Sequence, residues 1–169
     1  MDATRYPIGQ FNMVEPVTDT QYKEAVETLR RFPKKLRLTI DQLSEEDLKK
    51  TYREGSWSVQ QLIHHLADSH IHYYIRSKVA LTENTPTVST FNENDWAILA
   101  DTDLRPDVSL SIIASITMRW TTFLDSLSVT DTHSKLMHPE KGALTITQIV
   151  AMAAWHCEHH FAHIQLAIK

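Results

Sequence analysis

The sequence predicts an all-α protein, a four-helix bundle with a long crossover between its second and third helices. The chain has only 3 glycines among 169 residues, which favours long helices over a turn-rich β fold. Four segments carry apolar residues at spacings of three and four, the period of an amphipathic helix. A polar stretch between the second and third segments is too long for a simple loop and predicts the crossover.

The first two helices are predicted over residues 20–43 and from Ser58 to about Leu81. Pro33 interrupts the first, but the apolar spacing continues on both sides of it. We therefore expect one kinked helix, with two separate helices as the alternative. Ser58 and Gln61 form a capping-box pattern, which predicts where the second helix begins.

The third helix is predicted to follow Pro106-Asp107, and the fourth runs from a second capping box, Thr145 with Gln148, to the C-terminus. Residues 82–107 are expected to be irregular apart from a short turn at 94–96. Connections in bundles usually have about 2–8 residues, so this longer one suits a crossover. The second and third helices should then run parallel, and the second and fourth antiparallel.

Composition limits the classes of protein that the chain can be. Its length fits a single domain over residues 1–169. A net charge of −4 and a pI near 6.2 argue against a nucleic-acid partner. We expect no signal peptide, because the N-terminus lacks an apolar core, and no membrane span, because no apolar run is long enough. A lone cysteine, Cys157, is consistent with a reducing cytoplasm.

Histidines in the fourth and second helices predict a metal site. His159 and His163 are four residues apart, so a helix presents both imidazoles on one face. They lie fourteen and eighteen residues past the cap at Thr145, whereas His65 lies seven past Ser58. Antiparallel pairing of these helices, similar in predicted length, brings the three histidines level. We predict one divalent ion bound by His65, His159 and His163.

Other ligand sets are weaker on the same reasoning. His156 and His160 lie farther round the fourth helix from the expected inward face, although within the error of a helical wheel. Neither zincin pattern is present, since His156 is followed by Cys157 and Trp155 occupies the first position of the inverted motif. Paired Glu-x-x-His elements of di-iron bundles are also missing.

A polar stripe on the second helix predicts a pocket beside the metal. His65, Ser69, His72 and Arg76 follow one another at helical spacing, next to the apolar stripe. His72 is the candidate for proton transfer, and Arg76 for holding an anionic group of the substrate. The segment from His138 to Glu140 could fold over this pocket, although a structural loop is the simpler interpretation.

Several motifs resemble those of the YfiT-type branch of the DinB-like superfamily, nearly end to end. They are Tyr6-Pro7-Ile8-Gly9, Trp57-Ser58-Val59-Gln60-Gln61, His64 to His70, Tyr74-Ile75-Arg76, Thr82 to Pro86, Arg119-Trp120, His138-Pro139-Glu140 and Trp155 to Ile164. The resemblance implies a four-helix bundle, homodimers, and one nickel or zinc ion held at His65, His159 and His163. One departure from the family pattern is His72, which replaces a neutral residue.

Members of this branch are described as metal-dependent hydrolases, and superfamily relatives transfer low-molecular-weight thiols such as bacillithiol. The leading hypothesis is therefore a cytoplasmic hydrolase of small molecules in which the ion activates water. The second hypothesis is an S-transferase that conjugates a thiol to electrophiles, with Arg76 binding the thiol's carboxylates. A non-enzymatic metal-binding or dimerisation module is the third.

Overall fold

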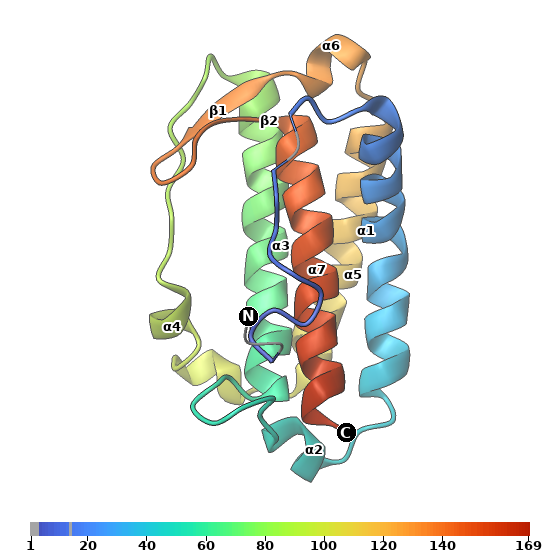
Figure 1. Ribbon diagram of the computed structural model, residues 1–169, viewed down its shortest axis with the longest axis vertical. Helices are drawn as coiled ribbons and strands as arrows, with labels where there is room; N and C mark the ends of the chain where they lie inside the picture. The colour runs from blue at the N-terminus through green and yellow to red at the C-terminus, as the bar shows by residue number, and fades with distance from the viewer. Residues whose placement is uncertain (1–3, 14) are drawn as a thin grey trace.

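Four long helices form the body of the protein in the computed structural model, which describes residues 4–13 and 15–169 (Figure 1). They are α1 (Asp19–Ile40), α3 (Val59–Thr82), α5 (Pro106–Asp125) and α7 (Ile146–Ala167). Each of α1 and α3 contacts both α5 and α7. The predicted four-helix bundle is confirmed.

The connection from α3 to α5 runs back along the length of the bundle, so these two helices point the same way (Figure 1). It contains the short helix α4 (Glu93–Trp96) and the 3-10 turn η1 (Ala100–Asp103). α7 runs opposite to α3 and packs along it. The predicted crossover is therefore present, with α4 where the sequence indicated a short turn.

Capping boxes begin α3 and α7 as predicted. The Ser58 hydroxyl accepts a hydrogen bond from the Gln61 amide, and the Gln61 side chain accepts one from the Ser58 amide. Thr145 and Gln148 make the same reciprocal pair at the start of α7. These bonds satisfy amide groups that a helix N-terminus otherwise leaves without partners.

Some local details agree with the sequence expectations and others differ. α1 is one continuous helix with Pro33 inside it, as preferred over two helices. It ends at Ile40, and a further short helix, α2 (Glu45–Lys49), is capped by Ser44. The segment around His138, expected to be a loop, instead contains strand β1 (Lys135–His138), which pairs with β2 (Gly142–Thr145) in an antiparallel hairpin.

The hairpin is tied to the crossover by backbone hydrogen bonds. The Met137 amide donates to the Pro86 carbonyl at 2.8 Å, and the Val88 amide donates to the Met137 carbonyl at 3.1 Å. Gly142 has φ 72°, the left-handed conformation that the turn between the strands requires. The hairpin and the crossover consequently form one wall beside α3.

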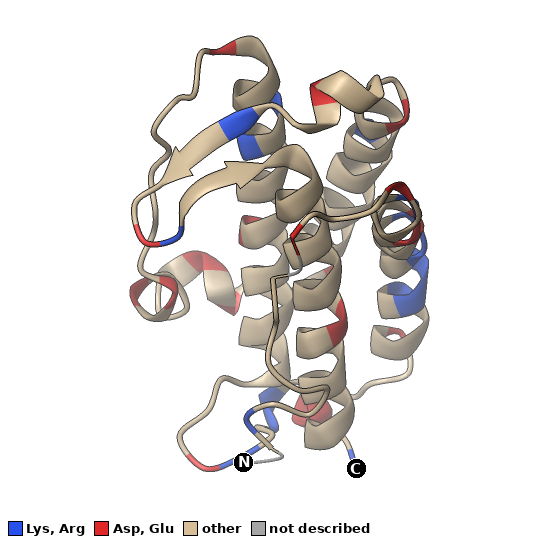
Figure 2. Cartoon of the chain, turned by 45° about the horizontal axis from the view of Figure 1, so that its top comes forward, with Lys and Arg blue, Asp and Glu red and all other residues tan. Residues whose placement is uncertain are grey.

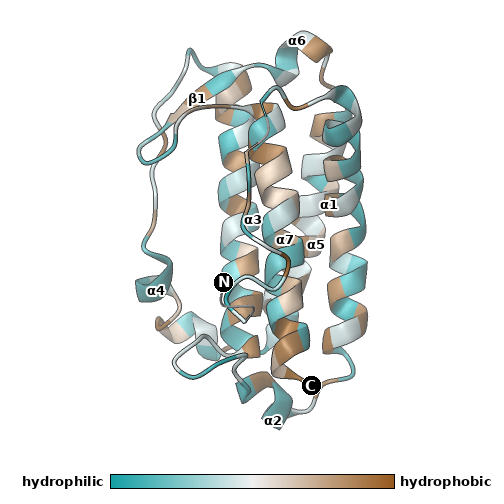
Figure 3. Ribbon diagram, viewed as in Figure 1, coloured by the Kyte–Doolittle hydropathy of each residue, from teal (hydrophilic) through white to brown (hydrophobic). Residues whose placement is uncertain are grey.

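The core lies between the four bundle helices, and Figure 3 shows α2 and α4 as mainly hydrophilic by comparison. Its largest fully buried side chains include Trp120, Phe32, Leu29, Leu36, Leu62 and Leu66. The Trp120 indole donates to the Ser77 hydroxyl at 3.2 Å, so its polar atom is satisfied inside the core.

No helix in the described part of the chain is long and apolar enough to cross a bilayer. Residues 1–3, which belong to the N-terminus considered for a signal peptide, and residue 14 lie outside the described residues.

The cap of α3 gives a stability prediction. Ser58→Ala removes the hydroxyl that accepts from Gln61, so the free energy of unfolding should fall by about 1 kcal/mol. Urea denaturation followed by circular dichroism measures the change. Ser111→Ala is the control, because Ser111 is exposed within α5 and alanine favours a helix interior. Equal losses in both variants would contradict the capping role.

Stability should also fall in acid because of His70. This ring is buried, donates from Nδ1 to the Leu66 carbonyl at 2.7 Å, and burial lowers its pKa from 6.5 to about 4. An unfolded chain takes up the proton near pH 6.5, whereas the folded one resists it, so stability present above pH 6.5 is lost as the pH falls towards 4. The contribution is at most ~3 kcal/mol.

The test compares the pH dependence of urea unfolding, in the presence of a chelator, for wild type and His70→Leu between pH 7 and 4.5. The variant should lose less stability across this range. His133→Gln, at an exposed position, controls for the loss of any histidine. A wild-type slope in His70→Leu would show that this ring does not resist protonation.

Candidate metal centre

Four histidines of α7 lie between its middle and its C-terminal end and face α3 and the N-terminal segment. Glu158 is the one Asp, Glu, Lys or Arg residue of α7 (Figure 2), and it pairs with Lys35 of α1. The antiparallel packing of α3 against α7 places His65 beside this part of the helix. The described residues form two groups of histidines that could hold an ion, and His160 belongs to both.

The first group joins the two helices and consists of His65, His156 and His160, whose ligand atoms all lie within 4.8 Å of one another. His65 Nε2 is 3.1 Å from His156 Nε2. His156 and His160 are four residues apart and therefore share one face of α7. The His65 side chain is buried, and the other two are partly buried.

The second group consists of His159, His160 and His163, all on α7. The His163 ring stacks on Tyr52 with centroids 3.9 Å apart, and its Nε2 lies 3.3 Å from the Arg5 carbonyl. The N-terminal segment therefore covers this group. It faces a second, smaller pocket of about 280 Å³.

The predicted ligand set was His65, His159 and His163. Among the described residues, the structure brings His159 together with His163, but it gives His65 a different pair of neighbours, His156 and His160. Adjacent faces of α7 carry the two pairs. The predicted set as a whole stays a prediction.

Burial keeps these imidazoles neutral. Desolvation lowers the pKa of His65 and of His159 to about 4. The pKa of His156 and of His160 is lowered well below 6.5, first by desolvation and then by the neighbouring histidines. Only neutral imidazole can donate a lone pair to a metal, so the first group is in the protonation state that a ligand set needs.

The first group also fits a single ion in its geometry. Two nitrogens that bind one tetrahedral ion at ~2.0–2.1 Å are about 3.3 Å apart, close to the 3.1 Å between His65 and His156. His156 Nδ1 is buried and has no hydrogen-bond partner among the described residues. An ion bound by this group would use His156 Nε2, so Nδ1, on the other side of the ring, would still need a partner such as water. The donor set, three neutral nitrogens, suits zinc or nickel.

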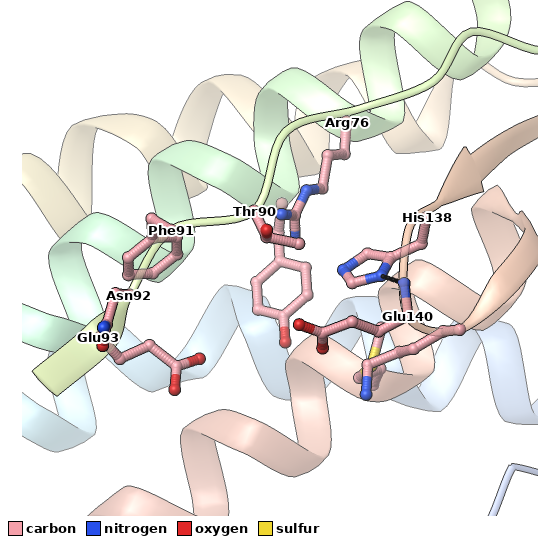
Figure 4. A pocket seen from close by; sticks show the side chains of 10 residues that line it. Arg76, Thr90, Phe91, Asn92, Glu93, His138 and Glu140 are labelled. Atoms are coloured by element: carbon pink, nitrogen blue, oxygen red, sulfur yellow. Dashed lines mark hydrogen bonds between the residues drawn. The ribbon is translucent and has the colours of Figure 1, made fainter.

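A pocket of about 500 Å³ opens between α3, the crossover and the hairpin (Figure 4). Its lining residues are Tyr73, Arg76, Thr90, Phe91, Asn92, Glu93, His138, Glu140, Lys141 and Met152. Two of them reach the first histidine group: the Tyr73 ring is 5.8 Å from His156, and the Phe91 ring is 6.4 Å from His65. The pocket therefore lies next to the candidate metal position.

The two residues predicted to act on the substrate have different positions. Arg76 lines the pocket and donates from Nη2 to the Ser89 carbonyl at 2.7 Å, while its buried Nε has no partner among the described residues. His72 stacks on Phe91, with centroids 4.4 Å apart, and is not among the described lining residues. Their catalytic roles stay predictions.

Sequence reasoning missed the opposite wall of the pocket. Glu93 and Glu140 lie on it and are far apart in the chain; Glu93 belongs to no recognised motif, and Glu140, part of the His138-Pro139-Glu140 motif, was given no role of its own. His138 also lines it, as one of the two interpretations of that segment allowed. Its Nδ1 accepts a hydrogen bond from the Glu140 amide at 3.2 Å, which leaves the proton of a neutral ring on Nε2. The signal that could have found this wall is Gly142, a turn residue between two short segments that can pair as a hairpin.

Comparisons with known proteins agree with this architecture. Two curated relatives are each named "Putative metal-dependent hydrolase". The one from Halalkalibacterium halodurans is 43% identical over 164 residues, covering 97% of this chain and 96% of the relative. The one from Oceanobacillus iheyensis is 41% identical over 165 residues, covering 98% and 96%.

Solved structures share the fold. YfiT from Bacillus subtilis, described as a probable metal-dependent hydrolase with an unusual four-helix bundle topology, superposes with a TM-score of 0.92 at 34% identity, covering 96% of this chain and 94% of that one. A mycothiol-dependent maleylpyruvate isomerase gives a TM-score of 0.63 at 17% identity, covering 86% and 58%, and shows a common fold alone.

The DinB superfamily pattern matches residues 28–164, from the middle of α1 to the last turn of α7. This match and the relatives above 40% identity agree with the resemblance found in the sequence motifs. The chain belongs to the DinB superfamily.

Proposed function

We propose that this protein is a metal-dependent hydrolase of small molecules, with one zinc or nickel ion held by His65 and two histidines of α7. The observation that supports this most is the convergence of three neutral imidazoles from two helices beside a pocket of about 500 Å³. Three nitrogen ligands leave coordination positions free, as in catalytic rather than structural zinc sites. The names of the relatives support the same class of reaction.

Geometry favours His156 and His160 as the partners of His65. The three form a compact group, and His156 Nε2 already lies 3.1 Å from His65 Nε2. The same group lies next to the larger pocket through Tyr73 and Phe91. His159 and His163, the pair expected from the sequence, are the alternative, because they are also four residues apart and close together.

A divalent ion at this position would act as a Lewis acid and lower the pKa of a bound water to ~7. The chain's own groups would bind and orient the substrate. Arg76 can hold an anionic group, since its guanidinium lines the pocket. Burial raises the pKa of Tyr73, so its phenol stays protonated and can donate a hydrogen bond to a carbonyl oxygen. Phe91 and Met152 add apolar side chains to the lining of this pocket.

Thiol transfer, the second hypothesis, is not favoured. The hydrolase names belong to relatives above 40% identity, whereas the thiol-dependent isomerase shares only 17%. Proton transfer by His72, homodimer formation and a cytoplasmic location stay predictions, and a chemical role for His72 would require movement of Phe91, on which its ring stacks.

Metal content of histidine variants distinguishes the two ligand sets. Wild type should retain about one ion per chain after dialysis, measured by plasma mass spectrometry. His65→Ala and His156→Ala should lose it, and His159→Ala should keep it, because His159 lies outside the group around His65. His160 belongs to the set favoured here and not to the set expected from the sequence, so His160→Ala should also lose the ion.

His133→Ala, at an exposed position on the hairpin side, is the control and should keep the ion. Loss in His159→Ala with retention in His156→Ala would favour the set expected from the sequence. Retention in His65→Ala would exclude both sets.

Hydrolysis should depend on the same ion. We expect the protein to cleave activated esters such as p-nitrophenyl acetate, to lose this activity with a chelator, and to regain it with zinc or nickel. His156→Ala should not regain it at metal concentrations that restore wild type. A parallel assay supplies bacillithiol with an alkylating electrophile; metal-dependent conjugation there, with no ester cleavage, would favour thiol transfer instead.

A further inference from the structure

The wall of the pocket opposite Arg76 carries two carboxylates. Glu93 comes from the start of α4, and Glu140 comes from the turn between β1 and β2. Figure 4 shows both side chains pointing into the same space, with Arg76 entering it from α3. The pairing of the hairpin with the crossover brings these two segments together. The pocket therefore presents negative charge on one wall and a guanidinium on another.

These charges have no ion-pair partners among the described residues. Elsewhere the protein pairs its charges, for example Arg30 with Asp125 and Arg37 with Asp107. Arg76, Glu93, Glu140 and the neighbouring Lys141 all line the pocket without forming such a pair. Two negative and two positive groups give this lining no net charge, so a ligand that carries both signs complements it best.

The two carboxylates are exposed to a ligand, whereas Arg76 is half-buried and its buried Nε has no partner among the described residues. Desolvation raises the pKa of Glu93, and the Glu140 carboxylate raises it further. Desolvation also lowers the pKa of Arg76. The half-buried guanidinium of Arg76 therefore has a free donor that a ligand carboxylate could occupy, and the exposed carboxylates of Glu93 and Glu140 are open to a ligand ammonium group.

We propose that the pocket binds small zwitterions of the amino-acid and dipeptide type, with the ammonium between Glu93 and Glu140 and the carboxylate on Arg76. This inference rests on the proposed function, because it names the substrate class of that site. A volume of about 500 Å³ lies within the usual range for small-molecule pockets. Tyr73 lies between the charged walls and the first histidine group, so the ligand's backbone would pass next to the metal position.

Four forms of one dipeptide test the proposal: glycyl-leucine, its N-acetyl form, its C-terminal amide, and the form blocked at both ends. Binding is measured by isothermal titration calorimetry with the protein as purified and again after chelation, so that binding is observed without turnover. Glycyl-leucine should bind most tightly, and each block should weaken binding about tenfold, because it removes one charge-assisted contact. Equal affinities for the four forms, or no binding of any, would overturn the proposal.

Variants of the protein show which side chains bind the ammonium and which side chain binds the carboxylate of the dipeptide. The double variant Glu93→Gln with Glu140→Gln should bind the two forms with a free ammonium about tenfold more weakly, and the N-acetyl form as wild type does. Arg76→Gln should weaken only the forms with a free carboxylate. Glu83→Gln, at the exposed cap that ends α3, is the matched control and should change nothing. Urea unfolding of each variant confirms that it folds.

The result of this binding experiment can be distinguished from the results of the tests of the proposed function. Charge-dependent binding to the chelated protein would support the zwitterion site even if histidine variants retained their metal content. Metal-dependent ester cleavage with equal binding of all four forms would support the hydrolase and overturn this inference.

Discussion

The antiparallel packing of α3 against α7 places His65 level with the histidines between the middle and the C-terminal end of α7, and the whole candidate site depends on this contact. A bundle of adjacent antiparallel neighbours would not need a connection that spans its length. Here the crossover returns the chain before α5 begins, so α3 and α5 run parallel and α7 runs opposite to both. The same crossover then forms a wall of the pocket beside the histidines. One topological feature thus serves both the ligand set and the substrate space.

Neutral imidazoles can be buried in the contact between α3 and α7, but they also reduce the stability of that contact. They can be buried without an ionic partner because their pKa falls well below 6.5, as at His65, His156 and His160. They still have nitrogens that need partners, and His156 Nδ1 and His159 Nδ1 have none among the described residues. An apolar side chain at each position would pack without this cost. Retaining so many histidines on one helix therefore favours a functional over a purely structural reason.

The parts of the fold that local chemistry determines could be predicted from the sequence. Ser58 and Thr145 begin their helices because the capping residues three positions later are present, and the polar length of residues 82–107 required the crossover. The choice between His156–His160 and His159–His163 could not be made, because the two pairs lie on adjacent faces of α7 and only tertiary packing decides which face meets His65. The hairpin was missed because its strands have four residues each, too few for a clear alternating pattern.

Glu93 and Glu140 illustrate a further limit. Their proximity depends on a few backbone hydrogen bonds between the crossover and β1, and no periodicity within either segment indicates it. The long helices and the connections nevertheless have different functions in the proposed site. The candidate ligands lie on long, capped helices whose positions are fixed by the core, whereas Glu93, Glu140 and Lys141 lie on short elements at the rim. Substitutions on the rim can change which charges a substrate must carry without moving the imidazoles, so substrate class and metal binding can vary independently within this architecture.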